Sequence, residues 1–311
     1  MRKLTIIGIV LIMICGSIHA QNTKNYTPVN LYMLNPLLVN PAYAGAREST
    51  SLTMMYGTNW PESVGAVFGN GFVAGRMMSV TGDVPISEKN SVGGMITENS
   101  FGVNNNLAFY GHYSYRIITG VGKLSFGLRA GLNIYSRNLL QANFRDPNDP
   151  VQINEKNVFP NFGAGVYWYS DNYFAGFSVP DFFFPSTGSG GFDVSPTNYN
   201  YTLMGGYLFE ASDDVKIKPS VLLNYSLKAP LAYQVNLSVV MFQDKVWLGA
   251  GYKSKGIVTL AEFQVSKPWR LGFSLEWPTG GVGSYVGTSF EVLIRRDFSY
   301  ELRTVSPAYF F

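Results

Sequence analysis

The chain is poor in cysteine, histidine and charge. Of its 311 residues, one is cysteine, two are histidine, and 14% carry a charged side chain. Soluble domains carry about 25% charged residues, so this composition is unlike that of an ordinary soluble protein. The net charge of +3 comes from lysines and arginines that are scattered singly, a pattern that does not indicate a nucleic-acid partner.

Long apolar runs are also missing, except at the start of the chain. Arg2 and Lys3 precede an apolar stretch, and Ala20 precedes Gln21, which together are typical of a secretory signal peptide cleaved after Ala20. Cleavage there would remove Cys15, so we expect an exported protein without a disulfide or a cysteine metal site. Beyond the signal, no run approaches the ~20 apolar residues that a membrane-spanning helix needs.

What the chain has instead is alternation with a period of two. In residues 123–135, Leu124, Phe126 and Leu128 alternate with Ser125 and Arg129 among others. This period predicts a strand, and the segment is much longer than the roughly 5–6 residues of a typical soluble strand. A long strand with one apolar and one polar face suits a barrel wall with lipid outside and a polar lumen inside.

About 14 such segments follow one another, so the sequence predicts an all-β, transmembrane antiparallel β-barrel of about 14 strands. A soluble β-sandwich is the alternative, but it would rarely need strands so long or so many. Residues 21–49 contain Pro28, Pro36 and Pro41 and hold no period, so we expect a non-strand segment that either plugs the lumen or covers one mouth. The expected organisation is a signal peptide at 1–20, this segment at 21–49, the barrel at 50–297 and a tail at 298–311.

Several charged residues have the parity of the lumen face. They are Arg129, Glu262, Arg270, Glu276, Glu291 and Arg295. Ionised groups in a lumen that is not fully aqueous need partners, so we expect some of them to pair across strands; contact with a secreted partner is the other possibility. Trp247, Trp269 and Trp277 lie near strand ends, where we expect the aromatic belt of a membrane interface.

Evidence for catalysis is sparse. His112 is the one histidine outside the expected signal peptide and has lumen parity, so a Ser-His-Asp site on the barrel is formally possible. A single histidine is more often a hydrogen-bonding structural residue, and two histidines for a zinc site are lacking. We expect no catalytic residue, no cofactor and no metal.

The residues resemble a known family. The motif Asn40, Pro41, Ala42, Tyr43, Ala44, Gly45 is similar to the N-terminal "NPAYAG" signature of the PorP/SprF family of type IX secretion membrane proteins. The likeness continues in order through 124–131, 160–167 and 247–252 to Ser306–Phe310. Residues 288–291 differ from the family's "GSHE" motif, with Phe290 in place of the histidine.

The resemblance implies a non-enzymatic barrel in the outer membrane of Bacteroidota. Family members are thought to work with the type IX secretion apparatus and with secreted proteins that carry a particular C-terminal domain. They help to export such a protein, for example a gliding adhesin, or hold it at the cell surface; others are linked to periplasmic or peptidoglycan-binding components. A diffusion channel for small solutes or lipids is the alternative function.

Overall fold

The computed structural model describes residues 29–58, 75–137, 155–185, 192–254, 256–279 and 288–298. The expected signal peptide and all but the first residue of the expected tail lie outside these ranges. None of the helices in the described ranges is long and apolar enough to cross a membrane.

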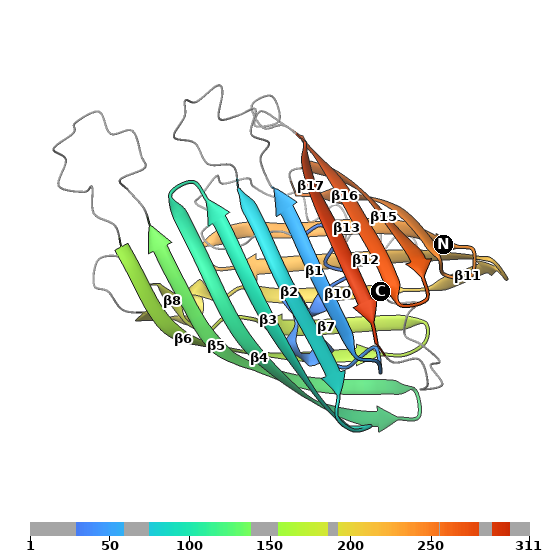
Figure 1. Cartoon of the computed structure of the whole chain (residues 1–311), viewed down its shortest axis with the longest axis horizontal. Coiled ribbons are helices and arrows are strands. Elements are labelled where there is room, and N and C mark those ends of the chain that lie inside the picture. Colours follow the sequence, from blue (N-terminus) through green and yellow to red (C-terminus); the bar gives the residue numbers. More distant parts are fainter. Residues whose placement is uncertain are drawn as a thin grey trace, which may run out of the picture.

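Fourteen antiparallel strands form a closed barrel, which confirms the predicted fold class (Figure 1). Consecutive strands pair with each other, β1 pairs with β17, and β10 pairs with both β7 and β12. The strands are β1 Ser51–Thr58, β2 Arg76–Pro85, β3 Asn90–Phe101, β4 Asn104–Thr119, β5 Gly122–Arg137, β6 Glu155–Tyr169, β7 Tyr173–Val179, β10 Tyr201–Tyr207, β12 Val215–Ser226, β13 Ala229–Met241, β14 Val246–Lys253, β15 Gly256–Ser266, β16 Trp269–Pro278 and β17 Ser289–Asp297.

Short elements accompany the barrel. Strand β11 (Phe209–Ser212) pairs with β12, and β8 (Phe184–Pro185) pairs with β9 (Phe192–Asp193). The 3-10 helices η1 (Pro36–Leu38) and η2 (Pro41–Tyr43) lie in the N-terminal segment, and η4 (Pro196–Asn198) precedes β10.

The alternation in β5 is as predicted. Phe126 and Leu128 are exposed on the outer face, whereas Ser125 and Arg129 are buried on the inner face. A wall that carries its apolar side chains outward is stable only where hydrocarbon replaces water.

The expected tryptophan positions are partly wrong. Trp269 and Trp277 lie on the outer face and are about 40% exposed, but Trp247 is fully buried inside the barrel. The parity of β14 explains the difference, because Leu248 points outward and its neighbour Trp247 therefore points inward. The assignment of Trp269 and Trp277 to a membrane interface stays a prediction.

The two ends of the barrel differ in the length of their connections. At one end, which also holds the start of β1 and the end of β17, most connections have two to four residues, for example 120–121 and 267–268. We call this the short-turn end. At the other end, the long-loop end, connections 59–75, 138–154 and 180–200 are far longer, whereas 102–103, 227–228 and 254–255 have two residues each.

Candidate functional site

Residues 29–47 lie inside the barrel, and we call them the plug (Figure 1, blue, behind the front wall). Every residue of the plug is buried except Leu38, which is half-buried. Of the two placements that the sequence left open for this segment, the contacts of the described part are those of a lumen plug.

The plug and the inner face of the wall share an apolar core. Leu31, Met33 and Leu34 are completely buried and join one cluster with inward side chains of the wall. The wall contributes Met55, Met77, Tyr167, Tyr169, Phe174, Met204, Leu222, Val240, Trp247, Leu260 and Leu293. Apolar side chains on the inner faces of ten strands are therefore buried against the plug, and this burial helps to keep the plug in the lumen.

A carboxylate binds the N-terminal end of the plug. The two oxygens of Glu291 accept the backbone N–H groups of Asn30 at 2.8 Å and of Leu31 at 2.9 Å. Glu291 on β17 is almost fully buried, so these two hydrogen bonds replace the hydration that its carboxylate has lost.

Two further wall residues hold Asn30. Lys253 donates from Nζ to the side-chain oxygen of Asn30 at 2.7 Å and pairs with Glu276 at 2.6 Å. Gln234 donates to the backbone carbonyl of Asn30 at 3.2 Å. Residues of β13, β14 and β17 therefore bind Asn30, and β17 also binds its neighbour Leu31.

Three of the lumen charges on β15 to β17 pair across strands, as the sequence predicts for some of them. Arg295 lies 2.8 Å from Glu262, and Arg270 lies 3.8 Å from the other oxygen of Glu262. Arg295 also donates to the carbonyl of Leu34, which accepts a second bond from Arg47 of the plug at 2.8 Å. The ion-pair network of the wall therefore continues into the plug.

The motif Asn40–Gly45 lies against the opposite wall, formed by β4 to β7. Asn40 donates to the carbonyl of Val166 at 3.0 Å, and Ser178 donates to the carbonyl of Val39 at 2.6 Å. The Asn40 side chain also accepts from the N–H of Ala42 and thereby caps η2.

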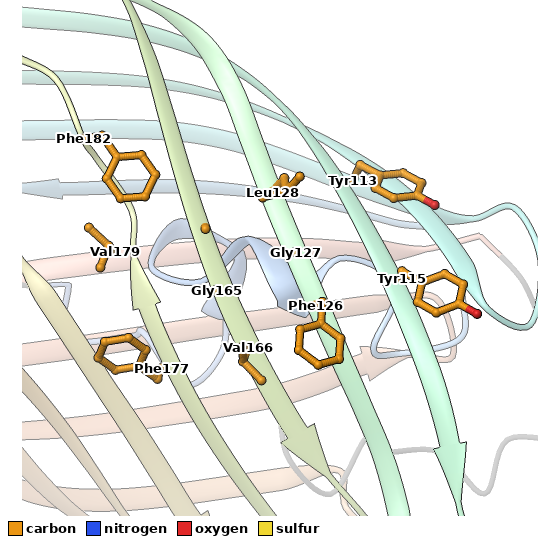
Figure 2. Close-up of a pocket in the computed structure, with 11 residues that line it drawn as sticks. Tyr113, Tyr115, Phe126, Gly127, Leu128, Gly165, Val166, Phe177, Val179 and Phe182 are labelled. Carbon is orange, nitrogen blue, oxygen red and sulfur yellow. The ribbon is translucent and has the colours of Figure 1, made fainter.

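Glycine makes room for this contact. A Cβ atom at Gly127 would lie 2.1 Å from the backbone nitrogen of Ala42, and one at Gly165 would lie 2.2 Å from Oδ1 of Asn40. Figure 2 shows the short helix of the plug directly behind Gly127 and Gly165. The close approach of plug and wall depends on the missing side chains at these two positions.

The end of the motif is fixed near the short-turn end. Asp83 accepts the N–H of Gly45 at 2.7 Å and the hydroxyl of Ser51 at 2.6 Å. Ser114 donates to the carbonyl of Ala44 at 2.7 Å, and Arg116 donates to the carbonyl of Gly45. Gly45 has a φ of 72°, a conformation that favours glycine.

Two tyrosines of the plug stay neutral. Burial raises the pKa of Tyr32 and of Tyr43 above the usual value of a phenol. The Tyr43 hydroxyl accepts from Arg47 at 2.9 Å, and its ring contacts that of Tyr167 edge-on at 5.5 Å.

Arg129 has a different partner from the other lumen charges. It forms an ion pair at 2.6 Å with Asp181, in the connection after β7. The same oxygen of Asp181 accepts from Tyr110 at 2.7 Å and from Asn161 at 2.8 Å. We call these four residues the Asp181 cluster.

His112 lies on the inner face of β4 opposite Arg129 of β5. Within the described ranges neither ring nitrogen has a hydrogen-bond partner. The described part of the chain likewise contains no group of three or more His, Cys, Asp or Glu side chains placed to bind a metal.

Sequence reasoning missed several of the plug's partners, although a signal for them exists. Asp83 shares the parity of the buried Ser79 and Thr81, and Lys253 shares that of Trp247. Both were therefore predictable as inward residues, but their contacts with Gly45 and Asn30 depend on the path of the plug, which no periodicity encodes.

Comparison with known proteins decides the family. The family model of the type IX secretion system membrane protein PorP/SprF matches residues 19–295, which is most of the chain. The chain belongs to the PorP/SprF family. It is therefore an outer-membrane β-barrel protein of the type IX secretion system, and this confirms the expected location.

Solved barrels share the fold of this PorP/SprF protein. A TodX deltaS2S3 mutant, a monoaromatic hydrocarbon channel, has a TM-score of 0.50 and 9% identity and matches over 90% of this chain and 96% of its own. The CymD monoaromatic hydrocarbon channel has a TM-score of 0.50 and 11% identity, with 88% and 94% covered. At such identities the likeness concerns the fold alone. No individually curated protein matches the chain.

Proposed function

We propose that this PorP/SprF protein is a plugged barrel that binds a secreted protein, such as an adhesin, and helps to export it or anchor it at the cell surface. Membership of a type IX secretion family supports a role in protein secretion. The plug carries the rest of the argument, because a filled lumen favours a docking protein over a diffusion channel.

The lumen charges support docking at a mouth of the barrel. Glu291 binds the plug, Glu262 pairs with Arg295, and Arg129 pairs with Asp181. A partner that entered the lumen would have to break these contacts. Each buried charge that then lacked a partner would cost several kcal/mol. A partner at the mouth would not.

The lengths of the connections suggest which mouth the partner contacts. In outer-membrane barrels short turns face the periplasm and long loops face the exterior. The plug would then join β1 at the periplasmic mouth, and connections 59–75, 138–154 and 180–200 would be on the side of a secreted protein. The short-turn end would face periplasmic or peptidoglycan-binding components of the secretion apparatus.

A mild-detergent pull-down of the tagged protein from its native outer membrane, followed by mass spectrometry, tests the proposal. Recovery of a large secreted protein through its C-terminal domain would support export or anchoring. Recovery of periplasmic ring or peptidoglycan-binding proteins alone would make the chain a part of the apparatus. A barrel recovered alone that conducts ions would contradict docking and favour the solute channel.

The proposal assigns no catalytic step and no cofactor to the chain. It therefore predicts that His112→Ala leaves the recovery of the partner unchanged. Loss of a hydrolytic activity in His112→Ala would contradict it.

A further inference from the structure

The lipid-facing wall contains an apolar groove that the plugged lumen does not explain. It has a volume of about 440 Å³ and lies on the outer face of β4 to β7 (Figure 2). Phe126 and Leu128 of β5 line one side, Phe177, Val179 and Phe182 line the other, and Ala164 of β6 lies between them.

The groove exists because small residues meet where a strand ends. Ala164 is the cross-strand neighbour of Leu128 on one side and of Val179 on the other, so a methyl group separates two larger side chains. Strand β7 ends at Val179, and the chain then turns toward the lumen, where Asp181 binds Arg129. Phe182 consequently closes the groove in place of a continuing strand.

Hydrocarbon is the medium that this face meets. Phe126, Leu128 and Phe177 are 44%, 62% and 47% exposed, and they continue the apolar outer face of an outer-membrane barrel. Among the residues that the structure describes, those that line the groove carry no charged side chain. An unfilled hollow would deprive its walls of dispersion contacts, so a flexible apolar chain from the bilayer is the natural occupant.

The position of the groove indicates the leaflet. Phe126 and Phe177 each lie four residues from the short-turn end of their strands, about 13 Å along the strand. Tyr113 and Tyr115 border the groove on β4, as the cross-strand neighbours of Leu128 and Phe126. The Tyr113 hydroxyl donates to Asn90, the first residue of β3 at the short-turn end, at 2.7 Å. Tyrosines at this border suit the headgroup region of the leaflet at the short-turn end.

We propose that this groove binds one acyl chain of a glycerophospholipid from the leaflet at the short-turn end. The lipid is then a resident component of the wall rather than an exchanging neighbour. This inference does not depend on the proposed docking function.

Native mass spectrometry of the whole mature protein in mild detergent tests the proposal with a matched pair of variants. Ala164→Phe fills the groove, whereas Ala250→Phe places the same side chain on the exposed outer face of β14, away from the groove. We expect one retained phospholipid in the wild type and in Ala250→Phe, and at least a tenfold lower occupancy in Ala164→Phe. Equal occupancy in both variants, no lipid in the wild type, or retention of lipopolysaccharide in place of phospholipid would overturn the proposal.

A second measurement needs no variant. The wild-type barrel is placed in vesicles of phosphatidylethanolamine and phosphatidylglycerol that contain a phosphatidylethanolamine with a photoactivatable diazirine in its acyl chain. We expect cross-links to concentrate at least tenfold in peptides from β5 to β7 relative to β13 to β15. Even labelling around the barrel would contradict a specific site.

Discussion

Glu291 shows how a single residue couples the wall to the plug. Its carboxylate accepts two adjacent backbone N–H groups, and hydrogen bonds to charged groups are worth about 1.5–3 kcal/mol each. Glu291→Gln keeps the size but loses the charge, and its amide group offers a donor where an acceptor is needed. We predict that this variant weakens the N-terminal end of the plug by about 1.5–3 kcal/mol.

Hydrogen exchange at the amides of Asn30 and Leu31 measures the effect. Their exchange is expected to accelerate by about tenfold or more, since 1.4 kcal/mol corresponds to a factor of ten. Glu210→Gln, on the exposed strand β11, is the matched control and is expected to leave both amides protected. Unchanged exchange in Glu291→Gln would show that the carboxylate does not hold the plug.

Single residues also show how much of the structure could be predicted from the sequence. The parity of β17 predicted that Glu291 points inward, and it does. Parity alone also assigns Trp247 inward, against the interface position that its place near a strand end suggested. The partner of Glu291 could not be predicted, because it belongs to a segment more than 250 residues away that has no regular structure.

At the scale of elements, the close packing of the plug against β5 and β6 depends on glycine. The nearest atoms to an added Cβ at Gly127 belong to the backbone of Pro41 and Ala42, which cannot move aside as a flexible side chain can. We predict that Gly127→Ala displaces η2 and increases protease cleavage and hydrogen exchange within residues 36–46. The barrel strands should stay protected.

Gly111→Ala is the control for this variant. Gly111 lies on the outer face of β4, where the nearest atom of another strand to an added Cβ is the carbonyl oxygen of Ala130 at 3.9 Å. It is expected to behave as the wild type. Equal protection of residues 36–46 in both variants would contradict the close contact between plug and wall.

The connection after β7 is also held by specific polar contacts, those of Asp181. Asp181→Ala leaves donors of Arg129, Tyr110 and Asn161 without this acceptor, at a cost of about 1–3 kcal/mol. We predict a lower free energy of unfolding by that amount in a urea titration in detergent micelles. Asp171→Ala, in the exposed turn after β6, is expected to have no effect, and an equal loss in both variants would rule out a special role for Asp181.

Elements were predictable in proportion to their regularity. The strict alternation at 106–118 and at 123–135 predicts two strands, and β4 and β5 extend these ranges by only one or two residues at each end. The alternation at 199–209 predicts one strand, which divides instead into β10 and the start of β11. The polar stretch 138–157 predicts a loop, but β6 already begins at Glu155. Prolines at 36 and 41 predicted a non-strand segment, but its route through the lumen follows from contacts with both walls, which no local pattern contains.

At the scale of the whole molecule, one segment connects walls that are far apart in the barrel. The plug binds β17 and β14 through Asn30, and it binds β6 and β7 through Val39 and Asn40. Glu291 and Asp83 satisfy backbone groups that a non-strand segment leaves unpaired. The barrel and its plug therefore form one folded unit, which supports a docking role at the mouths rather than transport through the lumen.

Ion conductance in a planar bilayer tests this account most directly. The protein is compared with a variant that lacks residues 21–47 and keeps every barrel strand. We predict no steady conductance for the complete protein and a stable open pore for the variant. The same trace from both proteins, or an open pore in the complete protein, would contradict a plug that closes the barrel.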